Sequence, residues 1–262
     1  MKVPIRMLGI ATFILWVFLA AFIALAAYSI KDLGLDVGET QVSTTPKGEL
    51  LFSLPVFIDN KGYSSLNNLQ ITTVFFDAGG AEISTASTSV PTISQGETAI
   101  ITHNATLNVN TLLLKGEQYL LEDQNLAASV ATGLTLAELL PVQISTNFTY
   151  PWGAPFYNFR LSQPLANGFN VTHYSAIVPV SFENHAAFDL TGNIRIQLLG
   201  NDDKLLSETQ TDFNASRQSS YADEIEFQIA LDSESLLDQN GHFNVYFSTA
   251  LFEYGPLVIP YG

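Results

Sequence analysis

Two apolar segments of this chain resemble each other: Leu54–Asn60 (LPVFIDN) and Val178–Asn184 (VPVSFEN). Their prolines lie 124 positions apart, and the same separation relates Ile101 to Ile225. A constant separation, kept over about fifty residues, is the signature of one structural unit that is used twice. The sequence therefore predicts an internal repeat.

Both copies show the pattern of β-strands. Residues alternate between apolar and polar in Ile194–Leu198 and Ile225–Ile229, which buries one face of a strand and leaves the other in water. The corresponding strands of the first copy are expected at Leu51–Ile58, Leu69–Phe76, Glu82–Val90 and Thr98–Leu107. The predicted fold class is all-β, with two tandem antiparallel β-sandwich domains of immunoglobulin-like type.

Two local features refine this expectation. Pro55 and Pro179 lie inside strand patterns, which predicts an edge strand, a strand start or a bulge, because proline has no N–H to donate. One short helix is expected in each copy, where Asn110 or Ser233 precedes paired leucines. We place the first domain at 35–153 and the second at 154–262.

The N-terminal region predicts a membrane anchor. Residues 7–29 contain no charged side chain, and about 20 apolar residues suffice for a helix to span a bilayer. Lys2 and Arg6 precede this run, so residues 1–6 are expected in the cytoplasm and the remainder outside the cell membrane, as an extracellular ectodomain. The alternative is a cleaved signal peptide, for which Ala24–Ala26 could be the cleavage site.

Composition limits the possible partners. The net charge is −15, charged residues make up only 13% of the chain, and there is no cysteine. A phosphate backbone would be repelled by such a chain, so nucleic acid is not expected as a partner. The expected partners are the membrane, through residues 7–29, and proteins of the envelope.

The repeat resembles a known domain family. Each copy has an apolar strand that ends in asparagine (Asn60, Asn184), and the first continues to a turn at Asp77–Gly80. Each also has a later strand followed by a paired leucine motif, at Thr111–Leu113 and Ser235–Leu237. This arrangement resembles the late-embryogenesis-abundant type 2, or WHy, domain. The resemblance implies a β-sandwich with a binding or structural role and no catalytic residues; where the family often has proline, this chain has Lys61 and His185.

No motif for catalysis or for a cofactor is present. The four histidines show no metal-ligand spacing, and the chain lacks both a G-x-S-x-G motif and a phosphate-binding loop. We therefore expect no catalytic residue, no cofactor and no metal site. The acidic turns Asn201–Asp203 and Asp238–Gly241 could bind calcium, or could be ordinary solvated turns.

Two further sets of residues are candidate sites. Four asparagines are followed by the glycosylation pattern, and modification would mark exposed positions of a glycoprotein: Asn104, Asn147, Asn170 and Asn214. Four aromatic residues near the domain junction form a candidate interface: Trp152, Phe156, Tyr157 and Phe159. These rings either pack the two domains together or form an exposed patch that receives a partner.

The sequence thus predicts a non-enzymatic, single-pass membrane protein with a structural or protein-binding role, such as an accessory subunit of an envelope or membrane assembly. One alternative is a subunit of a type-IV-pilin-like filament, since such proteins also join an apolar helix to a β domain. Another is an exported hydrolase, which the missing motifs disfavour.

Overall fold

The computed structural model describes residues 17, 21, 33–136, 138–169, 172–230 and 240–262, and this part of the chain is built mainly of antiparallel strands. The predicted all-β class is confirmed. Residues 33–152 form two four-stranded sheets: β1 (Leu33–Val37), β2 (Gln41–Thr44), β3 (Leu50–Asn60) and β6 (Thr98–Leu107) in one, and β5 (Glu82–Ile93), β4 (Leu66–Phe76), β7 (Gln124–Leu136) and β8 (Leu140–Trp152) in the other.

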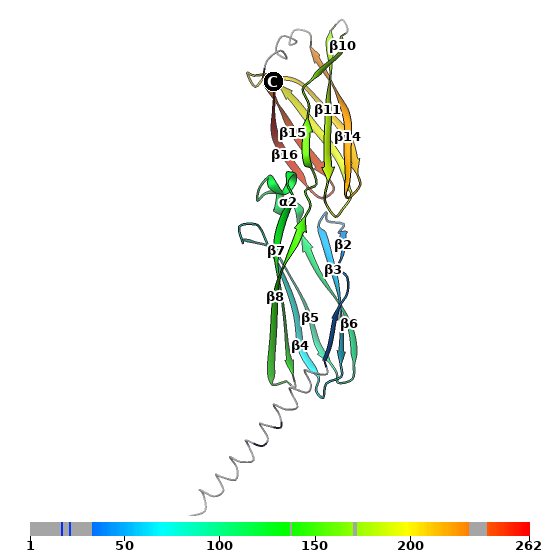
Figure 1. Ribbon diagram of the computed structural model, residues 1–262, viewed down its shortest axis with the longest axis vertical. Coiled ribbons are helices and arrows are strands. Elements are labelled where there is room, and N and C mark those ends of the chain that lie inside the picture. The colour runs from blue at the N-terminus through cyan, green and yellow to red at the C-terminus, as the bar shows by residue number, and fades with distance from the viewer. Residues whose placement is uncertain (1–16, 18–20, 22–32, 137, 170–171, 231–239) are drawn as a thin grey trace, which may run out of the picture.

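Residues 157–261 repeat this arrangement. One sheet contains β9 (Tyr157–Leu161), β10 (Leu165–Phe169), β11 (His173–Asn184) and β14 (Ser219–Ala230), and the other has the order β13 (Leu205–Ala215), β12 (Leu190–Leu199), β15 (Gly241–Thr249), β16 (Glu253–Tyr261). The pairs of sheets lie end to end and give an elongated molecule (Figure 1). We call them the first and second sandwich. No strand of the first is paired with a described strand of the second.

A short helical segment lies between the sandwiches. It contains α2 (Val109–Leu113) and α3 (Gln118–Leu121), and Asn108 caps α2 by accepting a hydrogen bond from the backbone N–H of Thr111 at 2.9 Å. The predicted helix is therefore present, although its cap is Asn108 and not Asn110. The helix expected near Ser233 lies outside the described residues.

The asparagine that ends each of the two similar segments has the same structural role in both copies. Asn60 and Asn184 are buried, and the side-chain amide of Asn184 donates to the backbone carbonyls of Phe188, Ala215 and Ser216 at 3.0–3.1 Å. The amide of Asn60 does the same for Ser64, Ile93 and Ser94. Each asparagine therefore ties together two loops at one end of its sandwich and gives their backbone carbonyl groups a hydrogen-bond donor.

The same contacts correct the constant spacing expected from the sequence. Phe188 lies 124 positions after Ser64, but Ala215 lies 122 positions after Ile93. Each strand of the β12–β13 hairpin is one residue shorter than its counterpart in β4–β5, so the strand that follows is shifted by two residues, and Ile225 corresponds to His103 and not to Ile101. A sequence pattern of period two cannot detect a two-residue shift, because each side chain stays on its face.

The two prolines also occupy a position that the sequence did not predict. β3 and β11 lie inside their sheets, and each is flanked on one side by two short strands. Pro55 faces the gap between β1 and β2, where its carbonyl accepts from Gly38, and Pro179 faces the gap between β9 and β10, where its carbonyl accepts from Ser162. The missing N–H is tolerated because the neighbouring strand is interrupted there.

The core is continuous along most of the molecule. One cluster of buried residues extends from Leu50 and Phe52 in the first sandwich, through α2 and α3, to Phe243 and Tyr261 in the second. A smaller cluster around Val56, Ile71 and Leu136 fills the far end of the first sandwich. The two sandwiches are therefore joined by buried apolar contacts and not by an exposed linker.

The predicted membrane anchor at 7–29 lies outside the described residues, apart from two isolated positions. Within the described part of the chain, none of the helices has the length and apolar character needed to cross a bilayer.

Candidate functional site

The junction between the sandwiches is formed by the segment that follows β8. At Gly153 the backbone lies so close to the carbonyl of His185 that there is no room for a Cβ atom. The indole N–H of Trp152 donates to the carbonyl of Tyr119 at 2.7 Å, and the backbone N–H of Phe156 donates to that of Leu120 at 3.0 Å. These two hydrogen bonds hold the segment against α3.

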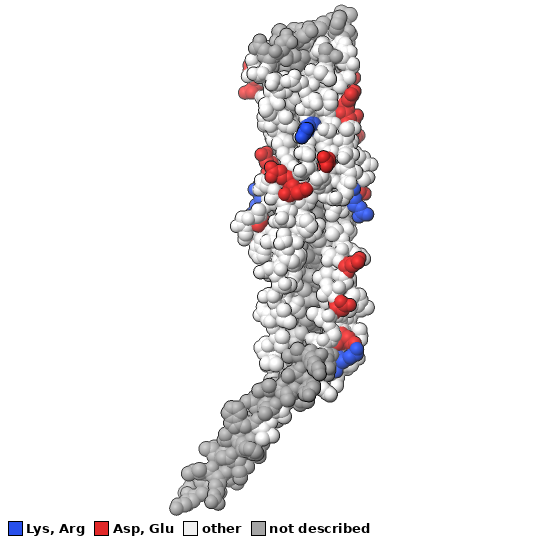
Figure 2. Space-filling view, viewed as in Figure 1, with Lys and Arg blue, Asp and Glu red and all other residues white. Residues whose placement is uncertain are grey.

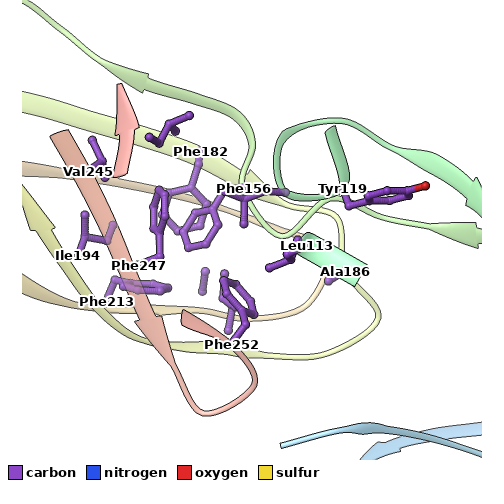
Figure 3. Close-up of a cluster of buried hydrophobic side chains, with 14 of the residues drawn as sticks. Leu113, Tyr119, Phe156, Phe182, Ala186, Ile194, Phe213, Val245, Phe247 and Phe252 are labelled. Atoms are coloured by element: carbon purple, nitrogen blue, oxygen red, sulfur yellow. The ribbon is translucent and has the colours of Figure 1, made fainter. Parts of the chain in front are cut away.

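The aromatic residues of the segment are directed into the molecule. Phe156 is fully buried and its ring lies 4.1 Å from that of Phe247 and 4.7 Å from that of Phe182, measured between centroids (Figure 3). Trp152 is buried, whereas Tyr157 and Phe159 are half-buried. The four predicted interface residues therefore pack the junction and the adjoining core of the second sandwich, and none of them forms an exposed patch.

A charged cluster lies over the same junction. The Nδ1 atom of His185 is 2.8 Å from a carboxylate oxygen of Asp123, and its Nε2 atom is 3.0 Å from Glu183. The ring of Tyr157 stacks on the imidazole at 4.2 Å, and the second oxygen of Asp123 accepts the backbone N–H of Ala154 at 2.9 Å. Asp123 thus links the end of the first sandwich to two segments of the second.

The histidine of this cluster has a raised pKa. The hydrogen bond to Asp123 is the largest cause, and the bond and charge of Glu183 act in the same direction, while partial burial opposes them. A histidine with two carboxylate partners donates through both nitrogens only when it is protonated. The cluster therefore holds the junction most firmly when His185 carries its charge.

We predict that the junction is more stable at mildly acid pH. The raised pKa of His185 means that its contribution is complete below the ordinary value of about 6.5 and is lost as the pH rises through the folded-state value. The unfolding temperature of the wild type should exceed that of His185→Gln by a few degrees at pH 5.5, and by much less at pH 8.5. Asp123→Asn should remove most of this pH-dependent difference; an equal difference at both pH values would contradict the account.

We also predict that Gly153→Ala destabilises the protein, because the added methyl group meets the carbonyl of His185. The expected loss is about 1–3 kcal/mol in the free energy of unfolding, measured in urea. Gly133→Ala in β7 is the matched control, since nothing lies within 4 Å of its Cβ position. Equal stability of both variants would show that the two backbones do not approach each other closely.

A second candidate site is the free edge of the first sandwich at β8. Among the strands that the structure describes, this strand of 13 residues pairs with β7 alone, and almost all of its residues are exposed. Neither β7 nor β8 contains a charged residue, and the first sandwich is largely uncharged where these strands lie (Figure 2). Ile144 is 66% exposed and Phe148 44%, so the edge offers both unpaired backbone groups and apolar side chains.

Such an edge is unusual for a protein that must avoid aggregation, because natural edges are normally protected by charges, bulges or short length. The opposite edge strand of the same sheet, β5, is covered: Ser84 donates to the carbonyl of Thr106 in β6, and Thr88 hydrogen-bonds to His103. The sequence does contain a signal for the exposed edge, namely the absence of charge from 139 to 159, but composition alone does not show which strand lies at an edge.

The remaining predicted sites are dispersed. Asn104, Asn147 and Asn214 are exposed on β6, β8 and β13, while Asn170 lies outside the described residues. The turn at Asn201–Asp203 is exposed, and Asp202 accepts the backbone N–H of Lys204, as in an ordinary turn. Within the described residues no group of three or more histidine, aspartate or glutamate side chains is arranged to hold a metal ion.

Comparison with known proteins does not assign a family. No family model and no curated protein matches the chain. Among solved structures, red sea bream transglutaminase is 16% identical over 87% of this chain and 31% of its own, with a TM-score of 0.30. The periplasmic chaperone SfaE is 15% identical over 84% of this chain and 96% of its own, with a TM-score of 0.27. The chain thus spans less than a third of the transglutaminase, and similarities this low support no functional argument.

Proposed function

We propose that this protein is a non-enzymatic surface protein, anchored in the cell membrane by residues 7–29, whose extracellular rod binds a protein partner through the edge strand β8. It would serve as an accessory subunit of an envelope or membrane assembly. The observation that carries this proposal is the long, uncharged and exposed edge of β8.

The chemistry of β8 favours partner binding by strand addition. A partner strand that pairs with β8 would satisfy the unpaired backbone groups of the edge, and pockets between alternate side chains would provide specificity. Leu140, Ile144 and Phe148 lie on the same face of β8, which continues the inward face of β7, so an added strand would extend both the sheet and its apolar face. The apolar face of β8 and its unpaired backbone groups therefore favour a protein partner over a charged ligand.

The junction supports a structural role for the rod. Because the core, the Gly153 contact and the Asp123 cluster join both sandwiches, the second sandwich would be held at a fixed distance from the first. A stiff rod behind a membrane anchor presents its edge and its tip at defined positions, which suits a subunit of an assembly.

Substitution of Ile144 with lysine tests this proposal. A charge on the face of β8 should prevent strand addition, as charges do on natural edge strands. Because Ile144 is exposed, the substitution should leave the fold of the protein intact. In intact cells, a photo-crosslinker placed at Thr146 in β8 should capture a partner in the wild type, and Ile144→Lys should reduce this capture by about tenfold or more, equivalent to about 1.4 kcal/mol. Ser89→Lys on β5 is the control and should leave capture unchanged. Equal capture by both variants would exclude β8 as the docking edge.

A further inference from the structure

The first sandwich contains a cavity between its two sheets. The cavity has a volume of about 220 Å³ and lies between the two sheets, with Phe52 and Leu54 of β3 on one side and Phe75 and Val130 on the other. Its lining contains no Lys, Arg, Asp or Glu. An apolar cavity of about 150 Å³ is large enough to bind benzene.

The inner end of the cavity is polar. His103 and Thr73 line it, and both are buried, with exposed fractions of 2% and 5%. The Nε2 atom of His103 lies 2.9 Å from the Thr73 hydroxyl, and its Nδ1 atom lies 2.8 Å from the hydroxyl of Thr88. Burial lowers the pKa of His103, which favours the neutral imidazole.

The second sandwich has apolar residues at the equivalent positions. Leu54 pairs with His103, and the corresponding Val178 pairs with Ile225, so isoleucine replaces histidine. Thr73 lies between the buried residues Ile71 and Phe75 of β4 and pairs with Val130. Ile196 likewise lies between the buried residues Ile194 and Leu198 of β12, and it pairs with Val245.

This comparison shows that the fold does not require the polar pair. A sandwich of the same topology is completed with two isoleucines, both buried. A buried histidine and threonine cost desolvation free energy that isoleucine avoids, so their presence next to a cavity indicates a role other than packing.

The outer end of the cavity opens at the side of the sandwich. Thr40, which precedes β2, and Phe148 in β8 are exposed lining residues, and Val42 and Tyr150 beside them are half-buried. The mouth therefore lies between the edge strands β2 and β8, while the polar pair lies on β4 and β6, away from that mouth.

We propose that this cavity binds a small neutral molecule with a slender apolar body and one terminal hydroxyl group, that is, a simple alcohol or phenol. The apolar body would fill the space between the sheets, and the hydroxyl would reach Thr73. In one tautomer of His103 the Thr73 hydroxyl accepts from Nε2 and can still donate; in the other it donates and can still accept.

A hydroxyl group, which both donates and accepts, matches Thr73 in either case. A carboxylate is disfavoured, because the lining offers no cation and His103 is neutral. This proposal does not rest on the proposed function, since it needs only the space between the two sheets, although Phe148 of β8 belongs both to the mouth and to the pairing edge.

The test uses 4-fluorophenol as the probe, with fluorobenzene and 4-fluorobenzoate as matched compounds that lack the hydroxyl group or carry a charge. Binding to the full chain, held in amphipol, is followed by the ¹⁹F signal of each probe and by the signals of ¹⁵N-labelled histidines. The wild type should bind 4-fluorophenol saturably, and at least about tenfold more tightly than either control compound. Among the histidine signals, that of His103 should respond.

Two variants locate the site. Thr73→Ile combined with His103→Ile installs the residues of the second sandwich and should weaken 4-fluorophenol binding by about tenfold or more while the protein stays folded. Val42→Trp narrows the mouth at a half-buried edge position and should also weaken binding. No saturable binding by the wild type, equal affinity for fluorobenzene, or unchanged affinity in Val42→Trp and in the folded double variant would each overturn the proposal.

Discussion

The architecture of this molecule depends on the close contact between the backbones at Gly153 and His185. Only glycine allows this approach, and it brings the end of β8 in the first sandwich directly against the loop between β11 and β12 in the second. The approach places Ala154 where its N–H reaches Asp123, and it places Phe156 where its ring enters the core of the second sandwich. Further contacts surround it: Asn110 accepts the backbone N–H of Glu253, and the turn at Gly48 lies against the carbonyl of Ala250. The result is a junction with buried packing and hydrogen bonds on several sides.

Within each sandwich the repeat preserves two devices that do not depend on side-chain volume. A buried asparagine places its two amide hydrogens among three backbone carbonyl groups at one end, and a proline faces an interruption in the neighbouring strand. Both features keep backbone groups hydrogen-bonded. The asparagine provides a donor for carbonyl groups, and the interruption means that no neighbouring carbonyl needs the N–H that proline lacks. The core residues around them have changed freely between the copies: Phe52 pairs with Ala105, whereas Ala176 pairs with Phe227 in the second. Total volume is kept while the large residue moves to the other strand.

Much of the fold could be predicted from the sequence, since alternation along Thr98–Leu107 and the other strands reports burial directly. The aromatic residues at the domain junction also indicated, as one of two interpretations, that they pack the two domains together. Other features depend on contacts between distant segments and leave no local pattern. The three residues of the junction cluster, Asp123, Glu183 and His185, are ordinary surface residues in the sequence, and His103 meets Thr73 and Thr88 only through the pairing of sheets. The two-residue shift within the repeat was hidden because it keeps every side chain on its face. The resemblance to the WHy domain, the domain boundaries and the membrane anchor stay predictions.

The contacts at the junction predict that the two sandwiches form a rigid rod, and a distance measured between the sandwiches tests this rigidity. The chain has no cysteine, so spin labels can be attached at Ser89→Cys on β5 and Asp212→Cys on β13, both at exposed positions. Pulsed electron paramagnetic resonance should give one narrow distribution of distances, because the buried contacts at Gly153, Asp123 and Phe156 fix the orientation of the two sandwiches. A broad distribution, or two separate maxima, would contradict a rigid rod.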